Sequence, residues 1–260
     1  MELLHALSVQ GRVISALTLR ETRSRYGNRK LGFFWAFFEP LAHVAVFVAI
    51  FSSMSRTSPI GDNTGLFILT GIMPFQLFNN IVTNIMNGLG ANKALLGYPQ
   101  VMPFDIIVSR VAIEFVSISV VFIFCIALAF YFGIEIKIDN FLQMMAPVAL
   151  LVLFATGVGM FNAAIMHSMP SYSNIYSALS RPLYFMSGIF FTMDFLSPKI
   201  LDFLSYNPLL NMVEWFRSGF YSSFDSSLYD VEYTVESTLI IFVIGLLAER
   251  ATSKKARQIT

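Results

Sequence analysis

The sequence predicts an all-α integral membrane protein with six transmembrane helices. Of its 260 residues 56% are apolar and 13% are charged, whereas about 25% of the residues of an ordinary soluble domain are charged. The apolar residues also gather into runs, and a helix needs about 20 mostly apolar residues to cross a hydrocarbon core. We predict six spans, at residues 32–54, 65–85, 105–133, 141–166, 175–193 and 237–248.

The six runs differ in how well each fits a straight crossing. The run at 105–133 exceeds the length that one crossing requires, so we expect a helix that is tilted or extends beyond the bilayer. The run at 141–166 carries no charge, and the run at 175–193 is interrupted only by Arg181 and Pro182. The last has the shortest charge-free core, "STLIIFVIGLLA", and would need help from Tyr233 and Val235 to span.

Lys and Arg are concentrated at the two ends of the chain. Residues 1–31 hold six of the 17 basic residues, and the tail after Ala248 holds four more. Because short basic segments stay in the cytoplasm, both termini are predicted to be cytoplasmic, a parity that six spans satisfy. Residues 1–31 then form an amphipathic helix in the cytoplasmic interface, 32–250 the six-span bundle and 251–260 a cytoplasmic tail, all within a single domain.

Two connections are predicted to hold helices too short to cross. The first lies between the second and third spans, where a short helix at residues 92–96 would project into the cytoplasm and dock a partner or serve as a plain connector. The second, residues 198–221, divides at Asn207 and Pro208 into a re-entrant or surface-lying hairpin. Aromatic belts are common at the outer interface, where four of its side chains are expected: Phe203, Tyr206, Trp215 and Phe216.

Several kinds of site are excluded or disfavoured by the sequence. No Gly-Lys pair occurs, so the chain has no Walker A loop for ATP. His5, His43 and His167 lie apart without neighbouring ligands, so we expect no metal site. The single cysteine, Cys125, forbids an internal disulfide. The net charge of +1 gives no reason to expect nucleic acid, and the basic ends are better explained as anchors at the membrane surface.

Ionisable side chains interrupt two of the predicted spans. Trp35, Glu39 and His43 recur every four residues and share one face of the first span. Ionisable groups at membrane depth usually face a cavity or a protein interior, so this face is either a pore or a packing network. Arg181 either reaches back to the cytoplasmic interface or faces an anionic cargo.

The segment "LRETRSRYGNRKLGFFWAFFEPLAH" closely resembles the start of the transmembrane subunit of Gram-negative capsular-polysaccharide ABC exporters, which are ABC-2 permeases. "GIMPFQLF", "YPQVMPFDIIVSR", "RPLYFMSGIFF" and "YNPLLNMVEWFR" continue the resemblance, which runs from about residue 17 to 217 in family order. The first segment is specific to this branch, and the others also resemble O-antigen and teichoic-acid exporters.

The resemblance implies a non-enzymatic permease in the bacterial inner membrane, as a homodimer joined to two ATP-binding subunits that carry ATP and Mg. No cofactor is expected on this chain. The cargo would be a lipid-linked, commonly acidic polysaccharide, passed to a periplasmic adaptor of the co-polymerase type and an outer-membrane channel. The implied ATPase-coupling residues are Asn92, Lys93, Ala94, Leu95 and Leu96. The implied substrate path holds Arg20, Arg23, Arg25, Tyr26, Trp35, Glu39, His43, Arg181 and Tyr184.

Three other functions stay open on the sequence alone. The first is an ABC-2 exporter of another cargo, such as O-antigen, teichoic acid or a small amphiphile. The second is a membrane-embedded transferase, for which Glu39 and His43 are the only candidate catalytic pair. The third is a secondary transporter, which commonly has internal repeats, and none is evident here.

Overall fold

The computed structural model describes residues 2–26, 32–53, 58–92, 95–98, 100–224 and 226–258. These residues fold almost entirely into helices, and the one β-contact among them is an isolated bridge between Ile138 and Tyr221. Two 3-10 helices occur, at Leu95–Gly97 and Met193–Phe195. The α-helices are α1 (Glu2–Tyr26), α2 (Gly32–Ser53), α3 (Thr64–Ala91), α4 (Pro103–Tyr131), α5 (Phe141–Ser168), α6 (Tyr172–Met186), α7 (Pro198–Leu204), α8 (Pro208–Phe220) and α9 (Val231–Gln258).

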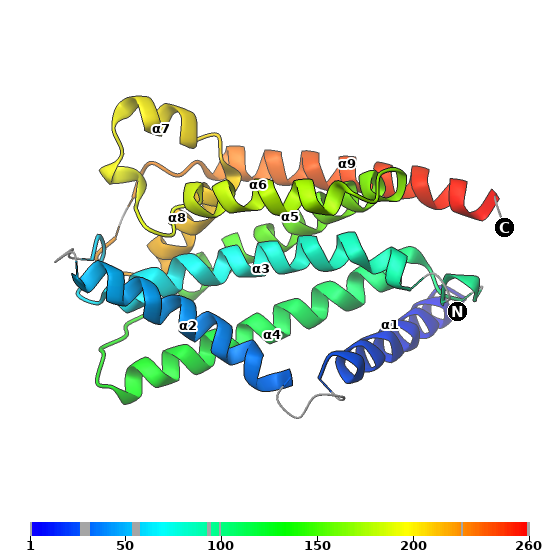
Figure 1. The fold of residues 1–260 in the computed structure, drawn as a ribbon, viewed down its shortest axis with the longest axis horizontal. Coiled ribbons are helices and arrows are strands. Elements are labelled where there is room, and N and C mark those ends of the chain that lie inside the picture. Colours follow the sequence, from blue (N-terminus) through cyan, green and yellow to red (C-terminus); the bar gives the residue numbers. More distant parts are fainter. Residues whose placement is uncertain are drawn as a thin grey trace.

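The long helices run side by side along the long axis of the molecule (Figure 1). The N and C termini lie at the same end, together with the connection between α3 and α4, and we call this end the termini side. The hairpin of α7 and α8 lies at the opposite end, which we call the α7 side. α1 packs against the part of α4 nearest the termini side, so it lies beside the bundle and not in its centre.

α3 is the central helix of the bundle. Of its membrane-length segment 78% is buried inside the protein, compared with 22% for α4 and 17% for α9. Phe67, Ile68, Ile72, Ile81 and Ile85 of α3 are all fully or almost fully buried and form the middle of the main core. The peripheral helices therefore direct most of their apolar side chains outward, as expected of helices whose other neighbour is lipid.

Four helices among the described residues are long and apolar enough to cross a membrane: residues 64–88 of α3, α4, α5 and residues 231–252 of α9. They correspond to the second, third, fourth and sixth predicted spans. The first predicted span matches α2, which contains a shorter apolar helical segment over Pro40–Phe51. These helices confirm the predicted all-α membrane architecture, whereas the full count of six crossings stays a prediction.

The fifth predicted span, 175–193, is wrong in its extent, because α6 ends at Met186. Gly188 follows with a φ of +73°, a backbone conformation that turns the chain away from a helix. The carbonyls of Gly188, Ile189 and Phe191 accept hydrogen bonds from Arg217 of α8. The end of this apolar run thus forms a turn, because the side chain of Arg217 donates hydrogen bonds to its backbone carbonyls.

The sixth span is longer than its charge-free core at 237–248. α9 begins at Val231, where the Oδ1 of Asp230 accepts a hydrogen bond from the backbone N–H of Tyr233 at 2.9 Å. Such a cap satisfies one of the free N–H groups of the first helical turn. Glu232 and Glu236 therefore lie within the first two turns of the helix and do not precede it.

The predicted short helix at 92–96 is displaced. α3 continues to Ala91, six residues beyond the predicted end of the second span, and the chain turns at Asn92 before the 3-10 helix Leu95–Gly97. The backbone carbonyl of Asn92 accepts the N–H of Leu95 at 2.9 Å and closes this turn. Lys93 and Ala94, also predicted to couple to an ATPase, lie outside the described residues.

Candidate functional site

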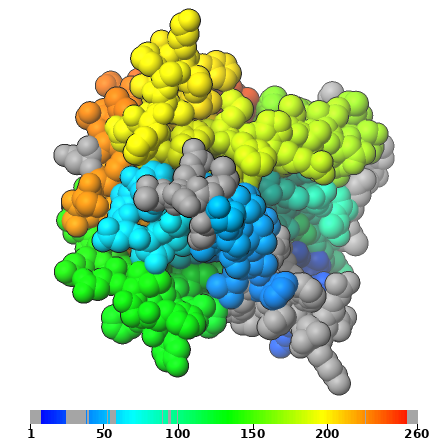
Figure 2. Space-filling view, turned by 60° about the vertical axis from the view of Figure 1, so that its left-hand side comes forward, coloured from blue at the N-terminus to red at the C-terminus, as the bar shows by residue number. Residues whose placement is uncertain are grey.

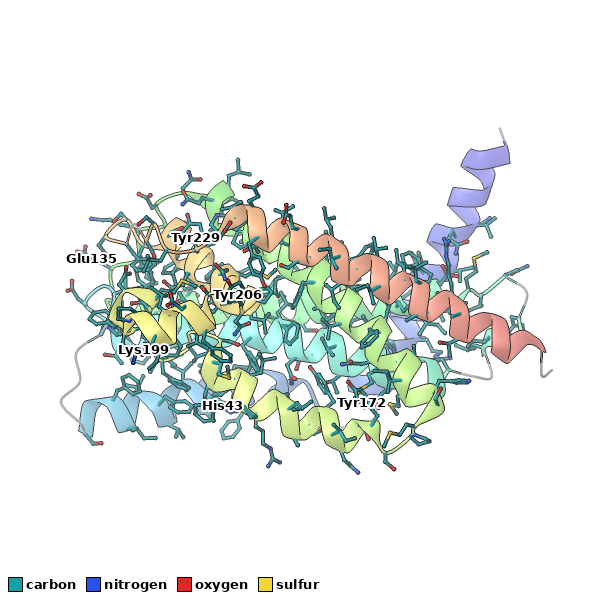
Figure 3. The ribbon with its side chains drawn as sticks, turned by 90° about the horizontal axis from the view of Figure 1, so that it is seen from above. His43, Glu135, Tyr172, Lys199, Tyr206 and Tyr229 are labelled. Atoms are coloured by element: carbon teal, nitrogen blue, oxygen red, sulfur yellow. The ribbon has the colours of Figure 1, made fainter. Side chains whose placement is uncertain are left out.

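α2 and α6 form one face of the molecule that carries ionisable side chains at the depth of the bundle. Figure 2 shows α2 in blue beside α6 in yellow-green, with α7 in yellow standing out above them. His43 of α2 and Arg181 of α6 are both exposed on the protein surface. In Figure 3 His43 lies between Tyr172 and Lys199 along the long axis, away from both ends of the bundle. A polar residue at such depth is costly when it faces lipid.

Exposed apolar and small side chains surround these two residues. On α2 they include Ala45, Val46, Ala49 and Ile50, and on α6 they include Ile175, Leu179 and Phe185. The face is thus mostly apolar with isolated polar groups. Such a surface suits contact with a second protein surface or an aqueous path better than contact with lipid alone.

Behind this face lies a cluster of aromatic rings that joins α2, α3 and the end of α6. The ring of Tyr184 meets Phe75 edge-on at 5.0 Å between centroids and lies 5.6 Å from Phe190. Phe47 of α2 lies 4.4 Å from Phe190. Aromatic pairs at these separations contribute about 0.5–1.5 kcal/mol beyond the area they bury. The cluster therefore holds α2 against the turn after α6.

The Tyr184 hydroxyl is buried and has no hydrogen-bond partner among the described residues. A buried hydroxyl without a partner costs free energy, so this group stands out within an otherwise apolar cluster. Tyr184 and Arg181 are one turn apart on α6, and both were predicted to line a substrate path. The Tyr184 ring also lies 6.4 Å from that of Phe47, one turn from His43 on α2.

Several other predicted path residues are placed elsewhere or not described. Arg23 is exposed on α1. Nη2 of Arg20 donates a hydrogen bond to Oδ1 of Asn92, which ties it to the end of α3. The side chains of Arg25, Tyr26, Trp35 and Glu39 lie outside the described residues, so the predicted stripe of Trp35, Glu39 and His43 is described only at His43.

The hairpin predicted at 198–221 is present as α7 and α8, divided at Asn207. The Oδ1 of Asn207 accepts the N–H of Leu209 at 3.1 Å, and Pro208 occupies the first helical position. Both residues favour a helix start at this point. The hairpin was thus predictable from the two residues that divide it.

The four aromatic residues of this hairpin have different surroundings. Phe203 and Tyr206 are exposed at the α7 side, and Trp215 stacks on Tyr229 at 6.1 Å with the rings 9° apart. The expectation of an interfacial position is wrong for Phe216, which is 4% exposed and packs on Phe122 and Phe220. It faces inward because α8 packs against both α3 and α5, which bury most of its side chains.

The structure reveals a buried ion pair on α8 that the sequence reasoning missed. Arg217 is completely buried, and its Nη1 lies 3.5 Å from Oε1 of Glu214, which is also buried. Arg217 donates to the carbonyls of Phe67, Gly188, Ile189 and Phe191. The guanidinium thereby joins α3, α8 and the turn after α6.

A signal for this pair was present in the sequence. Glu214 and Arg217 are three residues apart in "NPLLNMVEWFRSGF", so both lie on one side of a short helix whose remaining residues are mostly apolar. The sequence alone indicated no role for Arg217.

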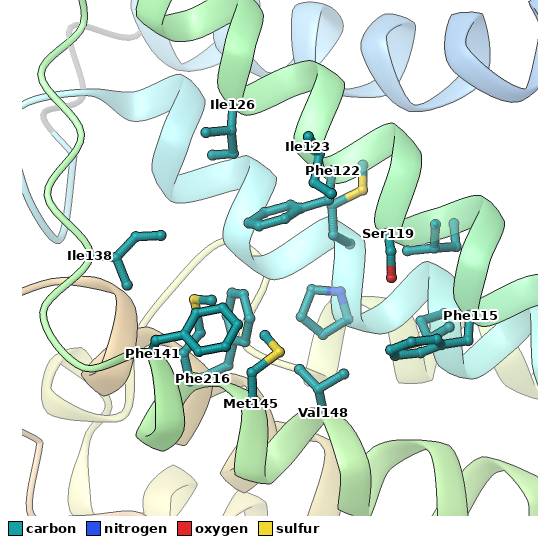
Figure 4. A pocket seen from close by; sticks show the side chains of 15 residues that line it. Phe115, Ser119, Phe122, Ile123, Ile126, Ile138, Phe141, Met145, Val148 and Phe216 are labelled. Atoms are coloured by element: carbon teal, nitrogen blue, oxygen red, sulfur yellow. The ribbon is translucent and has the colours of Figure 1, made fainter.

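An apolar pocket of about 320 Å³ lies between α3, α4 and α5 (Figure 4). Phe122, Met145 and Phe216 are among the side chains that line it, and Ser119 supplies one of its few polar groups. No group of metal-ligating side chains is found in the described part of the chain. This pocket therefore offers few polar groups to a ligand.

A family model described as "ABC-2 type transporter" matches residues 12–221. The chain belongs to the ABC-2 type transporter family. This ABC-2 chain is 32% identical over 243 residues to "Polysialic acid transport protein KpsM" of Escherichia coli, covering 93% of the chain and 94% of that relative. The predicted resemblance to this family is thus confirmed.

Two further relatives have similar coverage of this ABC-2 chain. "Capsule polysaccharide export inner-membrane protein BexB" of Haemophilus influenzae is 29% identical over 251 residues, covering 96% of the chain and 94% of the relative. "Capsule polysaccharide export inner-membrane protein CtrC" of Neisseria meningitidis serogroup B is 28% identical over 250 residues, covering 96% of the chain and 94% of the relative. Membership of the family identifies the chain as a transmembrane transporter subunit that is not itself a catalyst.

Proposed function

We propose that this chain is the membrane-spanning subunit of an ATP-driven exporter that moves capsular polysaccharide across the bacterial inner membrane. One observation carries the proposal: three relatives described as polysialic acid transport or capsule export proteins match the chain over at least 93% of its length. A relative described as an O-antigen export permease, RfbA of Klebsiella pneumoniae, matches 90% of the chain at 22% identity. Capsular polysaccharide is therefore the favoured cargo and O-antigen the second candidate.

We propose six crossings, by α2, α3, α4, α5, α6 and α9, within a single ABC-2 domain. A 15-residue helix such as α6 spans about 22 Å at 1.5 Å per residue, which is short of the roughly 30 Å of a hydrocarbon core. In this proposal the turn after α6 and the sunken hairpin of α7 and α8 complete the outer part of that crossing. The termini side is then cytoplasmic, as the basic residues near both termini favour.

We propose a homodimer with α2 and α6 at or near the subunit contact, because that face carries exposed polar groups. His43 and Arg181 would otherwise face lipid, which is unfavourable. A path for the cargo between two copies would place both residues beside water or an anionic polymer in place of lipid. Arg181, Tyr184 and His43, with Trp35 and Glu39, are the residues that we propose line it.

The cargo enters, in this proposal, at the basic residues before α2. Arg23, Arg25 and Tyr26 lie at the end of α1, and an anionic lipid-linked end would be attracted to this segment at the inner leaflet. Arg20 belongs to the same group by sequence, although its guanidinium already contacts Asn92. Recognition by charge and ring stacking requires no covalent chemistry on this chain.

The proposed partners follow from the family and from what the chain lacks. Family membership implies separate ATP-binding subunits, which would carry the ATP and Mg and engage residues 92–96. An ABC-2 permease is expected to need no cofactor of its own. On the α7 side we propose contact with a periplasmic adaptor of the co-polymerase type, which would lead to an outer-membrane channel.

ATP turnover in lipid vesicles tests the central part of this proposal. The purified chain alone should hydrolyse no ATP. Together with the ATPase encoded beside it, it should form a stable complex whose turnover responds to added capsular polysaccharide. Failure to bind any such ATPase would contradict an exporter, and a response to O-antigen but not to capsule would favour the second cargo.

A further inference from the structure

Three polar contacts hold α1 to the termini side of the bundle. Nε2 of Gln10 donates to Oδ1 of Asp105 at the start of α4. Nη2 of Arg20 donates to Oδ1 of Asn92 at the end of α3. Oε1 of Glu21 lies 3.1 Å from Nη2 of Arg110, in the second turn of α4. α1 is therefore fixed from its third turn to its sixth.

The bundle side of all three contacts is buried. Asn92, Asp105 and Arg110 are 4%, 0% and 6% exposed. Buried polar groups are costly unless they have hydrogen-bond or charge partners, and α1 supplies a partner to each of the three. The helix is thus more than an amphipathic element resting on the surface, because it supplies a polar contact to each of these three buried groups.

Asn92 has a position that links three segments. Its Nδ2 donates to the carbonyl of Gly88 in α3 at 2.9 Å, and its backbone carbonyl accepts the N–H of Leu95 in the following 3-10 turn. The first of these bonds leaves Oδ1 directed toward Arg20 of α1. One side chain therefore connects α3, the turn at 95–97 and α1.

Arg110 also connects α1 and α3. Its Nη1 donates to the carbonyl of Asn84 in α3 at 2.7 Å, while Nη2 pairs with Glu21. Its side chain crosses α3 at Gly88, where an added Cβ would lie 3.0 Å from Cδ of Arg110. Gly88 therefore leaves the room that lets Arg110 reach both α3 and α1.

We propose that Asn92 is a positioning residue that clamps α1 to the turn at residues 95–97, and that Arg110 holds α1 to α3 beside it. A displacement of this turn then moves α1 with it as one body. The inference rests on the proposed function, in which an ATP-binding subunit engages residues 92–96. The clamp would deliver that movement to the basic end of α1, directly before α2. Arg20 acts here through Asn92 and not by touching the cargo.

Substitutions at the Arg20 and Asn92 contact test the clamp in the assembled complex with its ATPase. We expect Arg20→Leu and Asn92→Leu each to leave ATP hydrolysis running while the polysaccharide exported per ATP falls several-fold. The double variant should be no worse than either single variant, because both remove the same contact. Arg12→Leu is the matched control, since Arg12 is exposed on the same helix, and it should leave the ratio unchanged.

The double variant also separates the clamp from a cargo role. If Arg20 bound the cargo directly, its loss would add to the effect of Asn92→Leu. Additive losses, or an unchanged ratio in both single variants, would overturn the clamp. Failure of the unmodified complex to export any polysaccharide would instead overturn the proposed function.

A cross-link tests the single-body movement without relying on loss of function. Arg20→Cys and Asn92→Cys are combined with Cys125→Ala, which removes the chain's only native thiol. A short bifunctional thiol reagent then joins the two positions. We expect cross-linking to restore export per ATP toward the unmodified value. Export that stops on cross-linking while ATP hydrolysis continues would mean that the two positions must separate, which would overturn the proposal.

Discussion

The guanidinium carbon of Arg217 lies 4.1 Å from the centre of the Phe67 ring, and both side chains are completely buried. Phe67 also offers its backbone carbonyl to Nη2 of Arg217 at 3.1 Å. One residue of α3 thus holds the cation by its ring and by its backbone. A cation in this position is stabilised only while these partners and Glu214 stay in place.

Replacing Arg217 by Met should destabilise the protein strongly. Breaking one side of a buried ion pair costs about 3–5 kcal/mol, because the other charge stays buried without its partner. We expect a lower Tm for the purified chain and less protein in the membrane. Lys199→Met, at an exposed cation of α7, is the control and should change neither value.

Adding Glu214→Gln to Arg217→Met should recover part of the lost stability. The double variant no longer buries an unpaired carboxylate, so its Tm should lie above that of Arg217→Met alone. A Tm equal to the sum of two independent losses would argue that Glu214 and Arg217 do not interact energetically.

α5 and α9 approach so closely that Gly245 tolerates no side chain. A Cβ at Gly245 would lie 2.3 Å from the carbonyl oxygen of Gly157, which is far inside van der Waals contact. Gly245→Ala should therefore cost about 1–3 kcal/mol through overpacking. Gly90→Ala is the matched control, since nothing lies within 4 Å of its added Cβ. An equal Tm for both variants would contradict the close packing.

Phe216 and Phe203 offer a paired test of the outer hairpin. Phe216 is 4% exposed and Phe203 is 68% exposed. Truncation of a buried Phe to Ala costs about 3–5 kcal/mol, whereas an exposed substitution usually stays within about 0.5 kcal/mol. Thermal unfolding of Phe216→Ala should thus shift well below that of Phe203→Ala. Equal shifts would place both residues at the outer interface, as the sequence had predicted.

Arg181→Gln tests the proposed cargo path on the α2 and α6 face. We expect the variant to reach the normal protein level and to bind the ATP-binding subunit normally. Export of an acidic capsule should fall several-fold, because a cation on the path is lost. Lys199→Gln, which removes an exposed cation from α7 instead, should export normally. Normal export by Arg181→Gln would leave Arg181 as an anchor at the membrane surface.

The sequence predicted the long helices well because apolar length decides them directly. The starts of α2, α4 and α5 lie within two residues of the predicted spans. α9 was underestimated because its first turns carry Glu232 and Glu236, which a charge-free criterion removes, while the cap at Asp230 starts the helix before them. Length and charge alone cannot detect such a cap.

The contacts that organise the site could not be predicted from the sequence, because they join residues that are far apart in the chain. Arg217 contacts Phe67 across 150 positions, and Gln10 contacts Asp105 across 95. The sequence alone indicated no role for Arg217, and the family resemblance placed Arg20 on the implied substrate path. Only the fold brings their partners near, and it is these partners that end α6 early and fix α1 to α3 and α4.

Polysaccharide export in cells that lack this chain tests the proposed function most directly. Its deletion should trap capsular polysaccharide in the cytoplasm, with none at the surface, and expression of the unmodified chain should restore the surface polymer. A surface capsule at the normal level in the deletion strain would contradict the proposed exporter.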